Sequence, residues 1–150
     1  MEAKHRKRNI MIFGIYCALM LWLLFDRTGG IEGMEYWSQI QTNLNLVPFH
    51  TIRLFLNVLG MQMYSSAAII NLGGNVIMFI PLGFFLPRVF PALQKFRRCI
   101  LATTLIITAV ELTQLFTLLG TCDIDDLILN VIGATIGYII FLFQVKKPAQ

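Results

Sequence analysis

Charged residues are scarce in this chain. Of its 150 residues, 13% are Asp, Glu, Lys or Arg and 57% are hydrophobic, and the mean hydropathy is +0.71. Soluble domains carry about 25% charged and roughly 45–50% apolar residues. The composition therefore excludes a disordered chain, a nucleic-acid-binding domain of ordinary composition and a secreted disulfide scaffold. Because a transmembrane helix needs about 20 apolar residues, the chain is long enough for four spans but not for an additional soluble catalytic domain.

The residues on which most enzyme motifs depend are also few. Cys17, Cys99 and Cys122 form no CxxC pair, so neither a disulfide framework nor a zinc site is indicated. The sequence contains no glycine-rich phosphate loop, no HExxH and no GxSxG. The only histidines are His5 and His50. A mechanism that pairs a serine or cysteine nucleophile with a histidine is therefore disfavoured.

Four apolar runs are long enough to cross a bilayer. They predict helices over residues 9–25, 67–86, 99–119 and 127–145, within one domain that spans residues 1–150. The first run follows a basic cluster, as a signal peptide does, but its length and the lack of a small-x-small cleavage site favour a retained anchor. The expected fold class is therefore an all-α membrane protein with four transmembrane helices.

Lysine and arginine are concentrated on one side of this predicted arrangement. Of the twelve, only Arg27 and Arg53 lie in the first and third loops. The others are Lys4, Arg6, Lys7, Arg8, Arg88, Lys95, Arg97, Arg98, Lys146 and Lys147. Because cytoplasmic loops are enriched in Lys and Arg, both termini are expected in the cytoplasm, with a long first extracytoplasmic loop over 26–66. Apolar residues at near-helical spacing in 51–64 predict a short helix there, either interfacial or packed on the bundle.

Glu111 lies in the middle of the third predicted span. A charge at this depth costs about 2.5–3.5 kcal/mol even on the mildest scale, which makes such a residue a functional candidate. The structural alternative is hydrogen bonding between helices, worth only about 0.6 kcal/mol on average. Thr104, Thr108 and Gln114 share the helical face of Glu111.

The fourth span carries a similar stripe. Asp126, Asn130, Gly133 and Gly137 follow one another at i, i+4, i+7 and i+11. Gly133-x-x-x-Gly137 is typical of close helix–helix contact. Asp123, just ahead of the helix, is a candidate N-cap.

These polar faces are expected to converge on a pocket that opens to the outside. Its predicted members are Asn75, Glu111, Gln114, Asp123, Asp126 and Asn130. Glu111, Asp123 and Asp126 are candidate ligands for Mg²⁺, and Glu111 and Asp126 are candidate acid–base groups. Neither pattern is specific, so no cofactor is assigned. For Asp123–Asp126 alone, a solvated loop with a helix cap is the plainer interpretation. Pro81, followed by Gly83, predicts a kink or break in the second span.

Four blocks of the sequence occur in an order typical of one family. They are Asn45-Leu-Val-Pro48-Phe49, Asn71-Leu-Gly-Gly-Asn75-Val-Ile-Met-Phe-Ile-Pro81-Leu-Gly83, Glu111-Leu-Thr-Gln114, and Gly120-Thr-Cys-Asp123-Ile-Asp125-Asp126-Leu-Ile-Leu-Asn130-Val-Ile-Gly133-Ala134. Together they resemble the VanZ-like membrane proteins. Many members carry an arginine soon after the glycine that begins the last block, but here Gly120 is followed by Thr121 and Cys122. Arg53 is then the only cation near a motif on the predicted outer side that could bind an anionic group.

The resemblance implies a protein of the bacterial cytoplasmic membrane in Gram-positive organisms. The family is associated with resistance to teicoplanin, which has a lipid tail, rather than to vancomycin. Our hypothesis for the mechanism is that the outward-facing pocket, with Arg53, binds the drug or an envelope lipid. Pro48, Pro81, Gly83, Gly133 and Gly137 are expected to be structural. Membrane lipid is the expected partner, nucleic acid is not, and the oligomeric state stays open. Two alternatives also stay open: a membrane hydrolase or transferase acting on a lipid-linked precursor, and a scaffold for envelope proteins.

Overall fold

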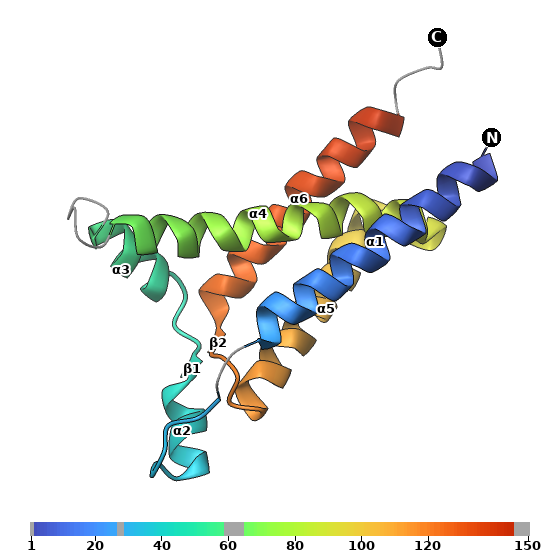
Figure 1. The fold of residues 1–150 in the computed structure, drawn as a ribbon. Coiled ribbons are helices and arrows are strands. Elements are labelled where there is room, and N and C mark those ends of the chain that lie inside the picture. The colour runs from blue at the N-terminus through green and yellow to red at the C-terminus, as the bar shows by residue number, and fades with distance from the viewer. Residues whose placement is uncertain (1, 27–28, 59–64, 146–150) are drawn as a thin grey trace.

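The computed structural model describes residues 2–26, 29–58 and 65–145 and is mostly helical (Figure 1). Its long helices are α1 (Glu2–Phe25), α4 (Ser65–Val89), α5 (Phe96–Phe116) and α6 (Ile124–Val145). The short elements are α2 (Tyr36–Thr42), β1 (Leu44–Asn45), α3 (His50–Val58), the 3-10 helix η1 (Pro91–Leu93) and β2 (Cys122–Asp123). Each long helix is long and apolar enough to cross a membrane. The four predicted spans are therefore present as four candidate membrane-spanning helices.

The long helices alternate in direction. The start of α1, the end of α4, the start of α5 and the end of α6 lie toward one end of the molecule (Figure 1). The other ends of α1, α5 and α6 approach β1 and β2 (Figure 1). We call this second region the β end. Helix α4 crosses α6 at an angle (Figure 1), and the two helices are in contact from Asn75 and Asp126 to Arg88 and Gln144.

Three glycines set the distance between α4 and α6. A Cβ at Gly83 would overlap the carbonyl oxygen of Ala134, and a Cβ at Gly133 would overlap that of Val76. Gly137 likewise faces the carbonyl oxygen of Ile80. The two backbones therefore touch directly, which is what small residues at membrane helix interfaces permit. The Gly133-x-x-x-Gly137 pattern of α6 therefore makes its close helix contact with α4 of the same chain.

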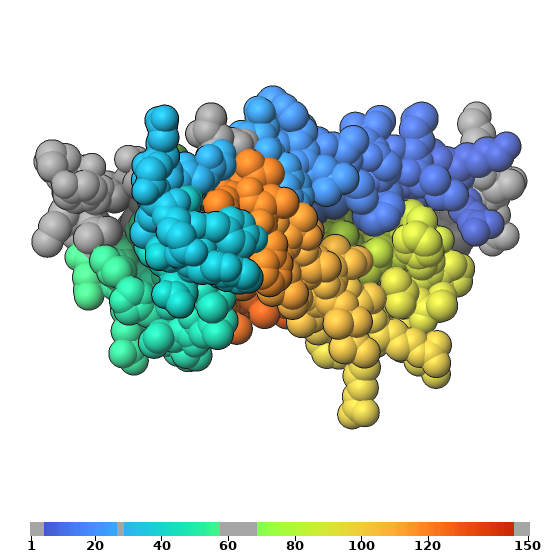
Figure 2. All heavy atoms as spheres, turned by 90° about the horizontal axis from the view of Figure 1, so that it is seen from below, coloured from blue at the N-terminus to red at the C-terminus, as the bar shows by residue number. Residues whose placement is uncertain are grey.

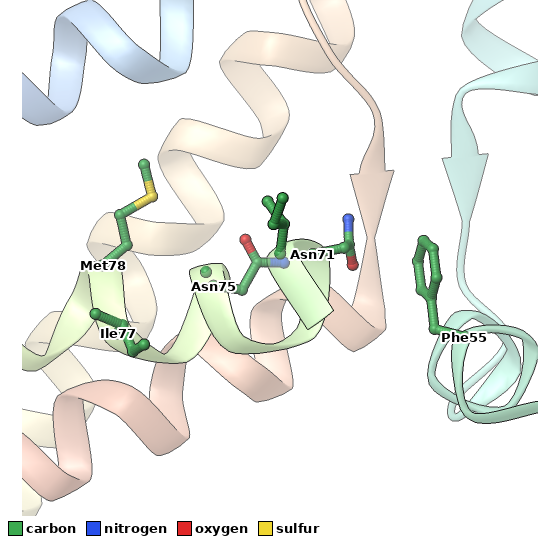
Figure 3. Close-up of a pocket in the computed structure, with 7 residues that line it drawn as sticks. Phe55, Asn71, Asn75, Ile77 and Met78 are labelled. Atoms are coloured by element: carbon green, nitrogen blue, oxygen red, sulfur yellow. The ribbon is translucent and has the colours of Figure 1, made fainter. Parts of the chain in front are cut away.

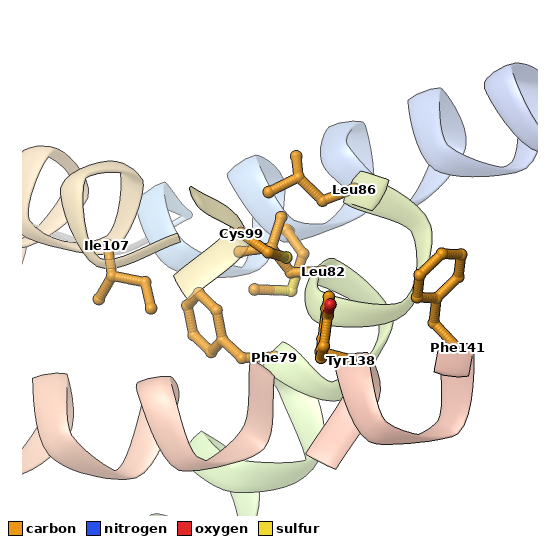
Figure 4. Packing of buried hydrophobic residues seen from close by; sticks show 8 residues of the cluster. Phe79, Leu82, Leu86, Cys99, Ile107, Tyr138 and Phe141 are labelled. Atoms are coloured by element: carbon orange, nitrogen blue, oxygen red, sulfur yellow. The ribbon is translucent and has the colours of Figure 1, made fainter. Parts of the chain in front are cut away.

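Apolar side chains from all four long helices form the core beside this crossing (Figure 4). The core residues are Met20 of α1, Phe79, Leu82 and Leu86 of α4, Cys99 and Ile107 of α5, and Tyr138 and Phe141 of α6. The Tyr138 hydroxyl donates to the Gln94 carbonyl at 2.7 Å, so its polar atom is satisfied. Large apolar residues on the outer surfaces, such as Leu105 and Phe143, stay exposed. Extensive exposed apolar surface is typical of lipid contact.

Of the kink or break expected in the second span, the structure contradicts the break. Helix α4 continues from Ser65 to Val89 with both Pro81 and Pro87 inside it. A proline leaves one backbone carbonyl of the preceding turn without its usual donor, and membrane helices tolerate this where neighbours compensate. At this level of α4, the Tyr16 hydroxyl of α1 donates to the Met78 carbonyl at 2.9 Å. This bond joins α1 to α4 one residue beyond Ile77, whose carbonyl lacks the amide donor that position 81 would otherwise supply.

Besides the helices of the predicted all-α fold, the structure contains one short pair of parallel strands. β1 pairs in parallel with β2, with Leu44 opposite Cys122 and Asn45 opposite Asp123. Beside this pair, the Gly30 amide donates to the Leu118 carbonyl at 3.1 Å. Figure 2 shows segment 29–45 in contact with the end of α5 and β2. Such a short pairing between distant segments has no local signature in the sequence.

Candidate functional site: a polar cavity beside an apolar groove

A small cavity lies among α1, α4, α5 and α6 near the β end. Its polar lining comprises Asn75 of α4, Glu111 and Gln114 of α5, Thr121, and Asp126 and Asn130 of α6. Leu24, Phe79 and Val110 complete its wall. The cavity volume is about 50 Å³, which exceeds the roughly 10–15 Å³ that one water-sized group requires. We call it the polar cavity.

Three of the six polar residues in this wall are deeply buried. Glu111 is 7% exposed, Gln114 5% and Asn130 3%. The Asn75 side-chain amide donates to Asp126 Oδ1 at 2.5 Å, and the Gln114 amide donates to the Leu24 carbonyl at 2.8 Å. Asn130 Oδ1 has no hydrogen-bond partner among the described residues. Asn75 and Gln114 thus each donate a hydrogen bond to a protein oxygen, whereas Asn130 Oδ1 can still accept one.

The structure brings five of the six predicted pocket residues to this cavity, all except Asp123. The carboxylate of Asp123 lies instead among Asn45 and Thr51. Arg53 is exposed on α3 and is not among the residues that line the cavity. On α5 the fully buried threonine is Thr103, not Thr104 or Thr108.

The three carboxylates proposed for Mg²⁺ are therefore not brought together. Only Glu111 and Asp126 line the polar cavity, and Asp123 does not. Within residues 2–26, 29–58 and 65–145, no group of three His, Cys, Asp or Glu side chains has the arrangement of a metal site. The chemistry of the polar cavity follows from two carboxyl groups with amides, not from three carboxylates.

A second polar cluster, which we call the acid clamp, ties the first loop to α6. Asp123 Oδ2 accepts hydrogen bonds from Thr51 Oγ at 2.6 Å and Asn45 Nδ2 at 3.0 Å, and its Oδ1 accepts the Asp125 amide at 2.8 Å. Asp123 therefore does accept from the first turn of α6, as expected of a cap. This explains why α6 begins at Ile124, earlier than the predicted 127.

Asp125 completes the acid clamp and was missed by sequence reasoning. It is fully buried, and its carboxylate accepts the backbone amides of Phe49 at 2.5 Å and Ile52 at 3.0 Å. Bonds between a carboxylate and backbone amides are strong because the acceptor is charged. The only sequence signal was the run of acids at the start of a span. That run suggested a helix terminus, but the partners lie more than 70 positions away.

The Pro48-Phe49 pair forms the turn that presents these amides. Phe49 has φ of 64°, and the His50 amide donates back to the Val47 carbonyl at 3.3 Å. Proline suits the second position of such a turn, and the third position normally takes glycine because φ is positive. The strained Phe49 is held by its short bond to Asp125. Pro48 is therefore part of the support for the acid clamp.

An open apolar groove lies on the other side of Asn75, between α3 and α4 (Figure 3). It is lined by Phe55, Ile70, Asn71, Gly74, Asn75, Ile77 and Met78 and has a volume of about 800 Å³. Phe55 projects from α3 toward α4 (Figure 3). Asn75 lines both the groove and the polar cavity, and Asn71 Oδ1 has no partner among the described residues.

The environment of Cys122, in β2, reflects the charge around both clusters. Burial raises the pKa of its thiol, and the negative charges of Glu111 and Asp123 raise it further. The three cysteines are free thiols. Cys122 therefore remains protonated near neutral pH and can serve as a reporter of the neighbouring carboxylates.

Residues 13–145, most of the chain, match the family model VanZ/LLP1. No curated protein and no solved structure matches the chain. The matched range contains all four sequence blocks and every residue of the polar cavity and the acid clamp. With its four membrane-spanning helices, this chain belongs to the VanZ/LLP1 family.

Proposed function

We propose that the chain is a multi-pass protein of the bacterial cytoplasmic membrane that lowers susceptibility to lipid-tailed glycopeptides such as teicoplanin. The observation that carries this proposal is the position of Asn75, which lines both the polar cavity and the apolar groove. An amphiphile needs an apolar surface for its chain and polar partners for its head. Teicoplanin differs from vancomycin by its acyl tail, which is the part that such a groove would bind.

The distribution of charge supports an orientation with the β end outside the cell. Arg6, Lys7 and Arg8 lie at the start of α1, and Arg97 and Arg98 lie at the start of α5. These starts lie toward the end of the molecule away from β1 and β2 (Figure 1). By the positive-inside rule, that end is cytoplasmic. Lys146 and Lys147, which also contribute to the prediction, lie outside the described residues.

In this orientation α3 lies at the outer membrane surface. Leu54 and Leu56 are more than half exposed, as a helix in contact with lipid headgroups requires. Residues 59–64 of the predicted interfacial helix lie outside the described residues. The acid clamp then holds α3 beside the groove, and Glu111 with Gln114 forms the floor of the polar cavity.

Orientation can be measured with single cysteines in a cysteine-free chain. Glu32→Cys, near the β end, should react with a membrane-impermeant maleimide in intact cells. Lys95→Cys, ahead of α5, should react only after the cells are permeabilised. The reverse pattern would contradict the proposed topology.

The function can be tested in a teicoplanin-sensitive Gram-positive host. Native protein, Glu111→Gln and Asp126→Asn are expressed at matched membrane levels, and teicoplanin and vancomycin susceptibilities are measured. We expect selective protection against teicoplanin from the native chain and its loss in both variants. Protection retained in both variants would remove the polar cavity from the mechanism. No protection from the native chain would contradict the drug-related function.

A further inference from the structure

We propose that the polar cavity receives a protonated amine, carried by an amphiphile whose alkyl chain lies in the groove between α3 and α4. This inference rests on the proposed function and specifies the chemistry of its ligand. The structure carries it through three features: the charge of the cavity, an acceptor without a donor, and the shared wall at Asn75.

The charge of the polar cavity favours a cation. Glu111 and Asp126 contribute two carboxyl groups, and none of the residues that line the cavity is Lys, Arg or His. An anionic head group would meet like charge in a buried site, which is strongly unfavourable. Because Arg53 lies outside this lining on α3, it does not offset that charge within the cavity wall. The same two carboxyl groups that repel an anionic head group attract a cationic one.

The hydrogen-bonding inventory favours a cation that donates. Asn130 is 3% exposed, and its Oδ1 has no partner among the described residues. A buried acceptor left in this state costs about 1–3 kcal/mol. The bonds of the nearby amides go to other acceptors, since Asn75 donates to Asp126 and Gln114 donates to the Leu24 carbonyl. An ammonium group offers three donors and no acceptor, which matches a site rich in acceptors.

The groove provides for the chain of the same molecule. Ile70, Ile77 and Met78 line it from α4, and Phe55 lines it from α3 (Figure 3). Asn75 belongs to both walls, so the polar and apolar sites meet at one residue. Asn71 Oδ1 adds a second acceptor without a partner on the groove side. An amine at the end of an alkyl chain fits both sites together.

The test uses the full chain in phosphatidylcholine nanodiscs, analysed by native mass spectrometry at pH 7. Dodecylamine, dodecanol and dodecyl phosphate are added at equal concentrations, with ethylamine and magnesium chloride as probes without a chain. The quaternary ammonium of phosphatidylcholine has no N–H to donate. We expect one dodecylamine per chain, retained at least about tenfold more strongly than dodecanol or dodecyl phosphate.

Two sets of variants test the site of the head group and the site of the alkyl chain separately. Glu111→Gln and Asn130→Leu should each reduce dodecylamine retention severalfold, whereas Thr135→Val, on the same helix as Asn130, should not. Gly74→Leu should place a side chain in the groove and reduce dodecylamine retention, and Gly73→Leu, outside the groove lining, is its matched control. A Cβ at either glycine meets nothing within 4 Å, so both variants should fold.

Equal retention of dodecyl phosphate would overturn the proposal, as would dodecylamine retention that neither Glu111→Gln nor Gly74→Leu changes. Magnesium binding that displaces dodecylamine and is lost in Glu111→Gln would also overturn it, in favour of an inorganic cation. If teicoplanin protection persists without amine binding, this inference fails and the proposed function stands. If the amine binds as expected but teicoplanin protection is absent, the inference stands and the proposed function fails.

Discussion

Asp125 and Asp126 are neighbours in the first turn of α6 but belong to two different polar regions. In the acid clamp, Asp125 accepts two backbone amides and Asp123 accepts two side chains and one amide. In the polar cavity, Asp126 accepts from Asn75 beside a buried amide oxygen of Asn130 that has no partner among the described residues. Both carboxylate oxygens of Asp123 and of Asp125 accept hydrogen bonds in the first region, whereas the second region holds a buried amide oxygen that accepts none from the described residues.

This difference separates a structural role from a binding role. A fully satisfied buried network makes the structure rigid, and the acid clamp holds the first loop and α3 against α6. A buried acceptor that the protein leaves without a donor requires an explanation, such as a ligand. Acidic residues alone would not distinguish the regions, since both contain two carboxylates.

Gly133→Leu should have the largest effect, because it separates the helices that form the polar cavity and does not touch the acid clamp. Overpacking costs about 1–3 kcal/mol where side chains can move. Here the new side chain meets the Val76 backbone, so we expect a larger loss and little folded protein. Fluorescence size-exclusion chromatography and thermal unfolding would measure it. Gly14→Leu, where a Cβ meets nothing within 4 Å, is the control. Normal folding of Gly133→Leu would contradict the close crossing.

Asp125→Ala should break the acid clamp and lower the free energy of unfolding by about 3 kcal/mol, because two amides lose a charged acceptor. Trypsin should then cut after Arg53 faster than in the native protein, since the amides of Phe49 and Ile52 no longer anchor the turn and α3. Asp126→Asn should leave both measurements close to native. If the two variants behaved alike, the distinction between the regions would be lost.

Replacement of Phe49 should reveal the backbone strain in the turn whose amide donates to Asp125 of the acid clamp. Both Phe49→Gly and Phe49→Ala remove the half-exposed ring, but only glycine adopts φ of 64° without a penalty. We expect Phe49→Gly to be the more stable by about 1 kcal/mol. Thermal unfolding of the two variants side by side would measure this. Equal stability, or a more stable alanine variant, would argue against the positive φ.

The smallest effect is expected at Cys122, in a chain with Cys17 and Cys99 replaced by alanine. Glu111→Gln removes a negative charge that raises the pKa of the Cys122 thiol. The pKa should fall, the thiolate fraction at pH 8 should rise, and iodoacetamide should react faster with Cys122 than in the parent chain. Glu32→Gln, on an exposed residue, is the control. An unchanged rate would show that Glu111 is not ionised near Cys122.

Several parts of this molecule could be predicted because their signals are local. Four apolar runs lead to four spanning helices, since backbone groups must be satisfied within each segment in lipid. Helical spacing placed Glu111 with Gln114 and Asp126 with Asn130, and both pairs line the polar cavity. Gly133-x-x-x-Gly137 indicated a close helix contact, and the contact is present. Periodicity alone carries this information.

Other parts depended on contacts between distant segments. Asp123 and Asp126 belong to one acidic run in the sequence. The side chains of Asn45 and Thr51, in the first loop and α3, donate hydrogen bonds to Asp123, whereas Asn75 of α4 donates to Asp126. The groove exists only because α3 lies beside α4. The sequence alone therefore determined which helices cross the membrane and which polar faces they carry. Only the tertiary structure decided which carboxylates accept hydrogen bonds at both oxygens and which line a cavity. The reason is that hydrogen bonds form between groups that are close in space, and these groups come from segments far apart in the sequence.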